Sequence, residues 1–202
     1  MSERPLLPIL GQDVRERSDA ARNRKALLEA AQRLVDHCGV ESVTMDAVAE
    51  AAGVGKGTVF RRFRTRSGLM AALLDQFEAD WQASVIGGPP PLGPGAPPRE
   101  RLLAFGRSRL EQNLRGAALI RAASTAAPAR NYAVYSFAAT HLRYLLDQLG
   151  VAGDIALLST ALMAPLEVVI LEQQIEIEGM DVERIASGWE DLAERIVSRT
   201  RE

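Results

Sequence analysis

Apolar residues recur at helical spacing along most of this chain. The first such stretch begins at Ser18 and ends at Gly39, a residue type that commonly stops a helix. Its apolar positions return every three or four residues: Ala26, Leu27, Ala30, Ala31, Leu34 and Val35. No segment alternates apolar and polar residues as a half-buried strand does, and no internal repeat is present. The pattern predicts an all-α fold of about nine helices.

Two short helices joined by a tight turn are predicted next. Thr44 offers a side-chain oxygen that can cap a helix over residues 45–52. The apolar face of this helix consists of Ala47, Val48 and Ala51. Gly53 can adopt the positive φ that a sharp turn between helices often requires. We expect Val54 to fill the gap between the two helices.

The second short helix is predicted over residues 56–63, with Val59 and Phe63 buried. Gly55 and Gly57 at its start carry no side chain, so another molecule can approach the backbone closely. Five basic residues lie in or just after this helix: Lys56, Arg61, Arg62, Arg64 and Arg66. Two short helices around such a turn are typical of a helix-turn-helix, which places its second helix in the major groove of DNA.

The remainder of the chain is predicted to be helical apart from one loop. Ser67 is expected to cap a helix that carries Leu69, Leu73, Phe77 and Trp81 along one side. In residues 87–98, six of twelve residues are proline and four are glycine, which favours a surface loop over an interdomain linker. Later helices are predicted over 99–114, 116–126, 129–149, 154–178 and 181–199, and Pro165 should kink the fourth of these.

Composition and charge restrict the class of protein. The 202 residues are 47% hydrophobic, and no apolar run approaches the roughly 18 residues that a membrane helix needs. Residues 1–18, which lack helical periodicity, are expected to form a disordered tail, and no signal peptide is apparent. A single cysteine, Cys38, excludes an intrachain disulfide and favours a reducing cytoplasm. Residues 1–75 carry a net charge of +2, whereas residues 76–202 carry −4.

The chemistry of the second short helix suits DNA. The N-terminus of a helix presents free N–H groups and a positive dipole end to phosphates. Thr58 adds a hydroxyl, and Lys56, Arg61 and Arg62 can span phosphates and base edges. Arginine bound to the O6 and N7 atoms of guanine is worth about 1–3 kcal/mol of discrimination. Arg64 and Arg66, just past the helix, are better placed for phosphates.

The segment over residues 22–74 resembles the DNA-binding domain of TetR-family transcriptional regulators. The resemblance is carried by an ordered set of residues: Leu28, Ala30, Ala31, Leu34, Gly39, Thr44, Val48, Ala49, Ala52, Gly53, Val54, Gly57, Thr58, Val59, Phe60, Phe63 and Leu69. It implies a helix-turn-helix domain over residues 19–66 and a helical ligand-binding and dimerisation domain over residues 67–202. The DNA-facing positions that it implies are Thr44, Gly55, Lys56, Gly57, Thr58, Phe60, Arg61, Arg62 and Arg66.

The chain departs from the pattern of the family at three positions. Phe60 stands where tyrosine is usual, so the phosphate contact of that hydroxyl is absent, and Arg61 or Arg62 is expected to replace it. Gly55 stands where serine is common. The acidic residue that usually follows position 66 is replaced by Ser67 and Gly68. These particular contacts of the family are not transferred to this chain.

The resemblance also implies a small-molecule effector. An apolar pocket with a few polar anchors is the usual design of such a site. The candidates to line it are Trp81, Phe105, Leu110, Asn113, Phe137, His141, Met163 and Glu167. The alternative is that these aromatic residues and the methionine are ordinary core. Glu167, in an apolar run, needs a partner if it is buried, and a cationic ligand or an arginine would serve.

A symmetric dimer is implied as well, through the helices over 154–178 and 181–199. Their apolar residues are Leu158, Leu162, Val169, Ile170, Ile177, Ile185, Trp189, Leu192 and Ile196. A dimer matches a palindromic operator with recognition helices about 34–36 Å apart. The expected function is therefore a homodimeric repressor that a small-molecule ligand releases from DNA. The alternatives are a helix-turn-helix protein without a ligand, an activator, and a protein-interaction module.

An enzyme is not expected. The chain contains two histidines and no metal-ligand cluster, phosphate-binding loop or nucleophile motif. His37 and Cys38 are adjacent, but neighbouring residues on a helix point about 100° apart. No catalytic residue, metal or cofactor is therefore expected.

Overall fold

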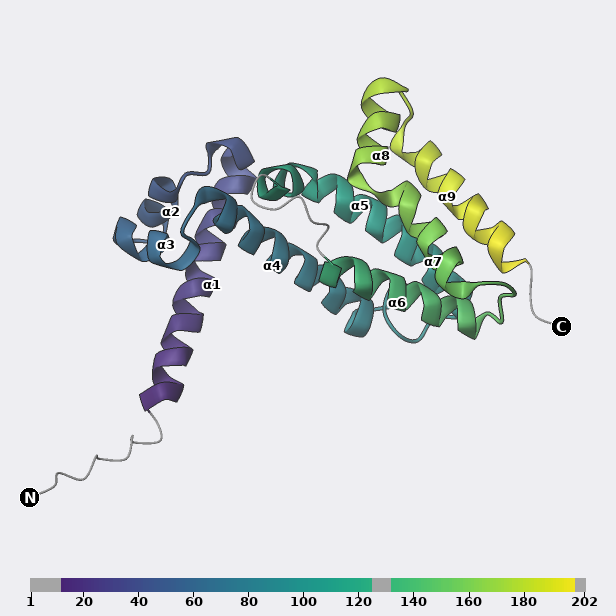
Figure 1. Ribbon diagram of the computed structural model, residues 1–202, viewed down its shortest axis with the longest axis horizontal. Helices are drawn as coiled ribbons and strands as arrows, with labels where there is room; N and C mark the ends of the chain where they lie inside the picture. The colour runs from purple at the N-terminus through teal and green to yellow at the C-terminus, as the bar shows by residue number, and fades with distance from the viewer. Residues whose placement is uncertain (1–11, 125–131, 199–202) are drawn as a thin grey trace, which may run out of the picture. The chain divides into compact units, whose positions relative to one another are not determined.

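Every secondary-structure element that the structure describes is a helix, which confirms the all-α prediction (Figure 1). The computed structural model describes residues 12–124 and 132–198, and these contain nine α-helices. The chain separates into two compact units, the first ending at Leu73 and the second beginning at Leu74.

The first unit contains three helices and the start of a fourth. These are α1 (Gln12–Cys38), α2 (Met45–Ala51), α3 (Lys56–Phe63) and α4 (Arg66–Gly87), with a 3₁₀ turn over Val40–Ser42. Helix α2 packs against both α1 and α3. The buried core of this unit is Leu27, Leu28, Ala30, Ala31, Val40, Val43, Met45, Val48, Ala49, Val59, Phe63, Leu69, Met70, Ala72 and Leu73.

Helix α1 begins earlier than the apolar pattern indicates. It begins at Gln12 rather than Ser18, so residues 12–18 of the expected tail are helical. Residues 1–11 lie outside the described residues. Glycine ends the helix as expected, because Gly39 has a φ of 76°.

The local signals for α2 are confirmed, but its buried face is rotated. The Thr44 hydroxyl accepts a hydrogen bond from the Ala47 amide at 3.1 Å, and Gly53 has a φ of 66°. Met45, Val48 and Ala49 are buried, whereas Ala51 is exposed and Ala47 is half-buried. Val54, expected between the two helices, is 38% exposed and is therefore not part of the buried core of this unit.

Helix α4 is capped by Thr65 rather than by Ser67. The Thr65 hydroxyl accepts a hydrogen bond from the Gly68 amide at 3.0 Å. Arg64, with a φ of 64°, ends α3 in the left-handed region and turns the chain sharply into α4. The cap therefore lies two residues earlier than predicted, because the turn occupies only Arg64 and Thr65.

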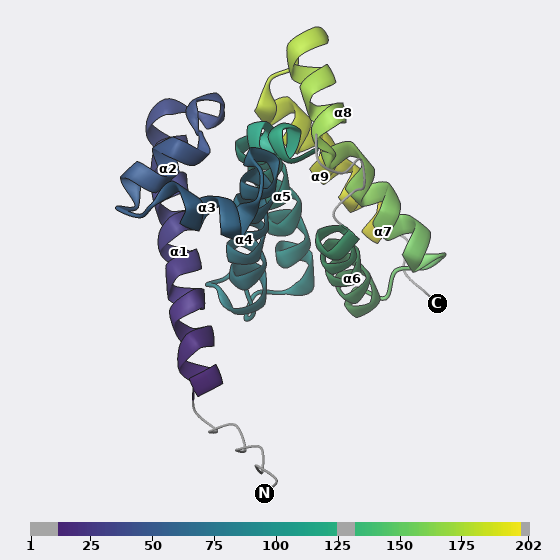
Figure 2. The same cartoon turned by 60° about the vertical axis from the view of Figure 1, so that its left-hand side comes forward.

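The second unit is a helical bundle (Figure 2). Its further elements are α5 (Pro98–Ser124), α6 (Tyr132–Gln148), α7 (Ile155–Met163), a 3₁₀ turn (Ala164–Leu166), α8 (Val168–Glu172), a π turn (Gln173–Ile177) and α9 (Val182–Val197). Helix α5 packs against α6 and α9, and α6 packs against α7. The loop rich in proline and glycine joins α4 to α5 inside this unit.

Helix α5 is a single helix and not the predicted pair over 99–114 and 116–126. Gly116 is buried within it, and a Cβ there would lie 3.0 Å from Cε1 of Phe77 on α4. Glycine at this position therefore permits a close approach of two helices and does not end one.

The predicted kink at Pro165 is confirmed as a complete break. Residues Ala164–Leu166 form a 3₁₀ turn, Glu167 is extended, and the segments Ile155–Leu166 and Val168–Ile177 are bent by 43°. The break leaves the carbonyl of Leu166 available, and Asn113 donates a hydrogen bond to it from Nδ2. In the described residues no single helix is long and apolar enough to cross a membrane, and only this bent pair passes by length and composition together.

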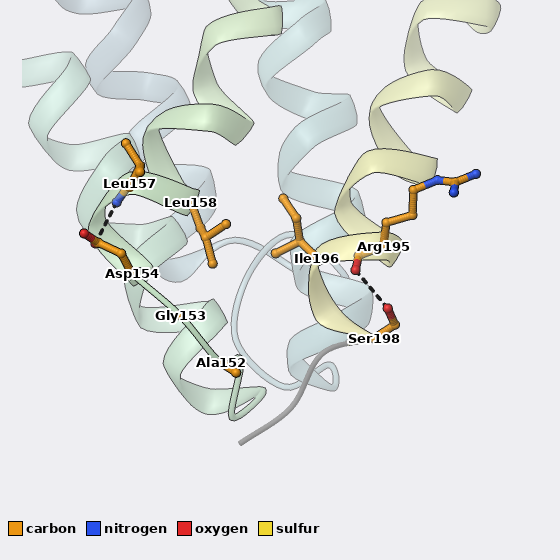
Figure 3. Close-up of a pocket in the computed structure, with 8 residues that line it drawn as sticks. All are labelled: Ala152, Gly153, Asp154, Leu157, Leu158, Arg195, Ile196 and Ser198. Atoms are coloured by element: carbon orange, nitrogen blue, oxygen red, sulfur yellow. Dashed lines mark hydrogen bonds between the residues drawn. The ribbon is translucent and has the colours of Figure 1, made fainter. Parts of the chain in front are cut away.

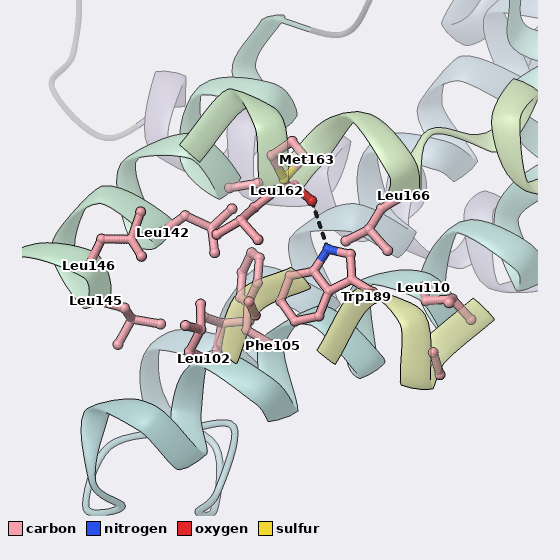
Figure 4. Close-up of a cluster of buried hydrophobic side chains, with 14 of the residues drawn as sticks. Leu102, Phe105, Leu110, Leu142, Leu145, Leu146, Leu162, Met163, Leu166 and Trp189 are labelled. Atoms are coloured by element: carbon pink, nitrogen blue, oxygen red, sulfur yellow. Dashed lines mark hydrogen bonds between the residues drawn. The ribbon is translucent and has the colours of Figure 1, made fainter. Parts of the chain in front are cut away.

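A dense apolar cluster forms the centre of the second unit (Figure 4). Leu102 and Phe105 from α5 meet Leu142 and Leu145 from α6. Trp189 of α9 donates a hydrogen bond from Nε1 to the carbonyl of Leu162 at 2.8 Å. The six-membered ring of Trp189 rests against Gly106, where any side chain would overlap it. The absence of a side chain at Gly106 therefore allows α9 to pack closely against α5.

Candidate nucleic-acid interface and candidate ligand site

Helix α3 buries only one narrow face. Val59 is fully buried and Phe63 nearly so. Thr58 is half-buried, and the remaining predicted DNA-facing residues of the helix are exposed: Lys56, Gly57, Phe60, Arg61 and Arg62. Phe60 is 47% exposed, an unusual environment for a large aromatic side chain. The geometry presents a mostly basic face with one apolar ring to solvent.

The start of α3 is open. A Cβ placed on Gly55 or Gly57 would meet nothing within 4 Å. Neither glycine has a positive φ, so the fold of the first unit requires glycine at neither position. The space beside both glycines leaves the backbone at the start of α3 accessible to a second molecule.

The basic side chains of α3 differ in their partners. Lys56 Nζ lies 2.6 Å from Oδ2 of Asp46 on α2, with both side chains exposed. Arg61 donates a hydrogen bond from Nε to the carbonyl of Gly57 at 3.2 Å. In the described part of the chain Arg62 makes no ion pair and no side-chain hydrogen bond. Arg62 is therefore the most available cation on this face.

Arg66 lies in a different environment. Its guanidinium donates from Nε to the carbonyl of Val43 at 2.8 Å and from NH2 to the carbonyl of Val40 at 2.6 Å. Glu41 adds a longer contact of 3.7 Å to the same nitrogen. The side chain is half-buried and ties α4 to the turn before α2. These hydrogen bonds give Arg66 a structural role. The DNA contact that the resemblance implies would be a second role of the same residue.

Replacing Arg66 with glutamine is expected to destabilise the first unit by about 2 kcal/mol, because two carbonyls lose a charged donor. Amide hydrogen exchange in α2 should then accelerate about 30-fold if it occurs through opening of this unit. Arg62→Gln is the matched control, and exchange in that variant should be unchanged. Equal exchange in Arg66→Gln and in the parent would contradict the structural role.

The predicted ligand-site residues fall into two groups. Trp81, Phe105, Leu110, Asn113 and Met163 are buried. Phe137, His141 and Glu167 are half-buried. The rings come together: the Trp81 centroid lies 5.3 Å from Phe105 and 5.9 Å from Phe137, and the Phe105 centroid lies 5.2 Å from His141. The structure thus brings four of the candidates into one aromatic cluster.

Polar side chains that the sequence did not single out surround this cluster. Arg109 NH1 lies 2.6 Å from Oε2 of Glu78, and both side chains are almost fully buried. The guanidinium carbon of Arg109 lies 4.7 Å from the centroid of Trp81, and Trp81 donates from Nε1 to Ser108 Oγ at 2.9 Å. The sequence does not distinguish these buried charged residues from charged residues on the solvent side of a helix. Helical spacing does not show which helix will pack against a given position.

A surface pocket of about 670 Å³ lies elsewhere in the second unit (Figure 3). It is lined by Ala152, Gly153, Asp154, Leu157, Leu158, Arg195, Ile196 and Ser198. None of these was predicted to line a ligand site, although Leu158 and Ile196 were predicted to lie in the dimer interface. Its polar groups already serve helix ends: Asp154 accepts from the Leu157 amide at 3.0 Å, and Ser198 donates to the carbonyl of Arg195 at 2.8 Å. These groups are therefore poor ligand anchors.

His141 has an altered ionisation. Burial, with a smaller contribution from the positive charge of Arg101, lowers the pKa of His141 from its ordinary value of 6.5 to about 4. The folded protein therefore keeps this ring neutral at pH values where the unfolded chain binds a proton. The contribution to stability is complete above the unfolded pKa and is lost as pH falls from 6.5 towards 4.

The acid sensitivity of the second unit should consequently depend on His141. The free energy of unfolding of the parent falls between pH 7 and pH 4.5, and replacing His141 with glutamine is expected to reduce that fall by about 1–2 kcal/mol. This is less than the full pKa shift would give, because the ring is only half-buried. Urea unfolding at pH 7 and pH 4.5 measures this difference. His37→Gln, at the only other histidine, is the control and should retain the loss of the parent. An identical loss in His141→Gln would contradict the assignment.

The comparisons with known proteins agree with this geometry. The family described as bacterial regulatory proteins, tetR family, matches residues 27–73. An HTH-type transcriptional regulator of Staphylococcus aureus (strain USA300) is 42% identical over 53 residues, which are 26% of this chain. The match covers 29% of the length of that relative, and the same holds for its counterpart in strain NCTC 8325.

Solved structures share the fold over most of the chain. A TetR-family regulator from Pectobacterium atrosepticum has a TM-score of 0.69 at 18% identity, covering 92% of this chain and 99% of its own. One from Haloarcula marismortui has a TM-score of 0.65 at 15% identity, covering 90% and 100%. A regulator from Saccharomonospora viridis, solved in complex with choline, has a TM-score of 0.63 at 18% identity, covering 86% and 96%.

The two kinds of likeness cover different parts of the molecule. The relatives in sequence match the helix-turn-helix unit, and the solved structures show that the second unit shares their fold. The resemblance found in the sequence is thereby confirmed for residues 27–73, which match the family described as bacterial regulatory proteins, tetR family, while the chain as a whole shares the fold of solved TetR-family regulators.

Proposed function

We propose that the protein is a homodimeric repressor that binds a palindromic DNA operator and leaves it when a small molecule binds the second unit. The observation that carries the DNA-binding part is the exposed face of α3. Val59 and Phe63 are the buried residues of this helix, so its basic side remains exposed. A helix with one buried face and one exposed basic face has the form that entry into a major groove requires.

The roles of individual residues follow from their surroundings. The open start of α3 at Gly55 and Gly57 permits close approach to a phosphate, where the helix dipole favours negative charge. Arg62, which has no partner in the described residues, is assigned a phosphate or guanine contact. Phe60 has no hydroxyl, so its exposed ring is assigned an apolar contact, such as the methyl group of thymine.

Dimerisation is supported by apolar side chains that the second unit leaves exposed. They lie on or next to the helices expected to pair: Leu157, Val169, Ile170, Ile177 and Val182. Three of the residues first assigned to this surface, Leu162, Ile185 and Trp189, belong instead to the core of their own chain. The proposed interface is therefore narrower than the apolar pattern suggested and is centred on α8 and the π turn.

Release by a ligand requires that the ligand bind one state of the protein better than the other. The second unit contains an aromatic cluster with buried polar neighbours, which is the usual composition of a small-molecule site. The choline complex of the Saccharomonospora viridis protein supports the idea that a fold of this kind accommodates a small organic ligand.

A mobility-shift titration tests the proposal. The protein is mixed with the DNA upstream of its own gene and, separately, with a scrambled duplex of the same composition. We expect a preference of about 10³-fold or more for a palindromic site at moderate salt. Equal affinity for both duplexes would overturn DNA reading. Binding with one protein chain per site would overturn the dimer, and transcription that rises on binding would favour the activator alternative.

Arg62→Ala is expected to weaken operator binding by about 1–3 kcal/mol per subunit, because one guanidinium contact is lost. If the contact is to a phosphate, the slope of log K against log salt should fall by about one per subunit. Arg115→Ala, at an exposed arginine of α5, is the control and should leave both quantities unchanged. Unaltered affinity in Arg62→Ala would favour the alternative in which this face binds a protein.

A further inference from the structure

One stripe of α5 collects buried polar atoms without partners. Arg101, Phe105, Arg109 and Asn113 follow one another at intervals of four residues and therefore lie along one side of the helix. In this stripe Arg101 Nε, Arg109 Nε and Asn113 Oδ1 are buried and have no hydrogen-bond partner within the described residues. Since buried polar groups are normally satisfied, three such atoms on one stripe call for an explanation.

A fourth such atom lies on the neighbouring helix. His141 Nε2 on α6 is also buried and without a partner in the part of the chain that the structure describes. The His141 ring stacks on Phe105, with centroids 5.2 Å apart, and lies nearly parallel to Phe137, with centroids 6.2 Å apart. The unpartnered nitrogen thus belongs to a ring that sits among aromatic side chains.

Charge distinguishes the two ends of the stripe. Arg109 is neutralised by Glu78, whose carboxylate oxygen lies 2.6 Å away. Arg101 forms no ion pair in the described residues, although it is half-buried and its Nε is shielded from solvent. An uncompensated cation in such a place is unfavourable unless an anion joins it. The first turn of α5, where Arg101 lies, is also the end of the helix that favours negative charge.

We propose that Arg101 and His141 form an anion-binding site that takes an organic carboxylate, with the aromatic or apolar body of that ligand against Phe105 and Phe137. The inference rests on the proposed function only in regarding this ligand as the effector. The Arg101 guanidinium donates to the carboxylate, and His141 donates from Nε2 once it carries a proton there. The unpartnered atoms on Arg109 and Asn113 lie about 12 and 18 Å farther along α5 and are not assigned to this ligand.

Two other properties support this site. Arg101 lies one turn before Phe105 on the same side of α5, and the His141 ring stacks on Phe105, so both polar groups lie next to the same aromatic ring. The positive charge of Arg101 also contributes to the lowered pKa of His141, which agrees with this placement. Tyr144, one turn beyond His141 on α6, is 51% exposed, and its ring centroid lies 6.2 Å from that of His141. Arg101 and His141 are themselves only half-buried, so the proposed site lies near the surface of the helical bundle.

The test uses the full-length protein and benzoate as the probe. The chain has only two histidines, so their ring protons can be followed separately by NMR as pH is varied. Saturating benzoate is expected to raise the pKa of His141 by about one unit, because the bound anion favours the charged ring. The ring-proton signals of His37, which is exposed, should not respond to benzoate and serve as an internal control.

Three matched probes define the ligand class. Benzamide has the same body without the charge, phenyltrimethylammonium reverses the charge, and acetate has the charge without the ring. We expect no rise in the pKa of His141 with the first two and a much weaker response to acetate. A rise with benzamide equal to that with benzoate would overturn the anion assignment, and an equal affinity for acetate would overturn the role of the aromatic rings.

Variants locate the site. Arg101→Gln is expected to lower benzoate affinity at least tenfold, whereas Arg115→Gln, at an exposed arginine on the same helix, should have no effect. Retained affinity in Arg101→Gln, or no response of the parent to benzoate, would overturn the proposal. These measurements contain no DNA, so they are independent of the mobility shift. If benzoate binds through Arg101 but leaves operator binding unchanged, the anion site stands and its role as effector site fails.

Discussion

Removing the carboxylate of Glu78 is expected to destabilise the second unit by about 3–5 kcal/mol, the usual loss when one partner of a buried ion pair is deleted. Glu78 and Arg109 have side chains only 4% and 8% exposed, so the arginine left behind cannot regain its water. Urea unfolding of Glu78→Ala measures the change. Tryptophan emission is the appropriate signal because Trp81 and Trp189, the only two tryptophans, both lie in the second unit.

The double variant Glu78→Leu with Arg109→Met is the control for this prediction. It removes both charges while keeping apolar volume, and such exchanges are often neutral or stabilising. Most of the lost stability should therefore return. If Glu78→Ala loses less than about 1 kcal/mol, which is typical of an exposed pair, the pair is not desolvated in solution. If the double variant is as unstable as Glu78→Ala, the loss comes from packing and not from an unpaired charge.

Gly106→Ala is expected to destabilise the same unit by about 3 kcal/mol, because overpacking forces either the backbone or a ring to move. The added methyl group would overlap the six-membered ring of Trp189, which is itself held by its hydrogen bond to the carbonyl of Leu162. The ring cannot turn away without losing that bond. Thermal unfolding followed by near-ultraviolet circular dichroism reports the change in the surroundings of Trp189.

The matched control adds the same methyl group where it meets nothing. Gly188 lies on α9, and a Cβ there has no neighbour within 4 Å. Alanine is a better helix former than glycine by about 1 kcal/mol, so Gly188→Ala should stabilise the protein slightly. An equal effect of the two substitutions would mean that contact with Trp189 does not determine the outcome.

What the sequence predicted correctly is encoded locally. Thr44 caps α2 because its own hydroxyl reaches an amide three residues later, and Gly53 supplies a backbone conformation that needs no distant partner. The bounds of α3 agree with the prediction because the apolar spacing of Val59 and Phe63 is a local pattern. Pro165 breaks its helix for an equally local reason, the missing N–H.

What the sequence did not predict depends on partners far along the chain. The carbonyls that hold Arg66 belong to Val40 and Val43, more than twenty residues earlier. Gly116 lies inside α5 because the ring of Phe77 on α4 packs against it, a contact that the local sequence does not indicate. The sequence indicates the aromatic candidates only by residue type. That Trp81, Phe105 and His141 lie together follows from the packing of α4, α5 and α6.

The ion pair between Lys56 and Asp46 bears on how the proposed regulator would search for its operator. Lys56 Nζ already has a carboxylate 2.6 Å away, so a phosphate gains this contact only by sharing the ammonium with the negative charge of Asp46 or by displacing it. Exchanging one anion for another adds little attraction on arbitrary DNA. Asp46 would thus compete with DNA phosphates for Lys56. This competition would shorten the residence time of the protein on non-specific DNA and speed its search for the operator.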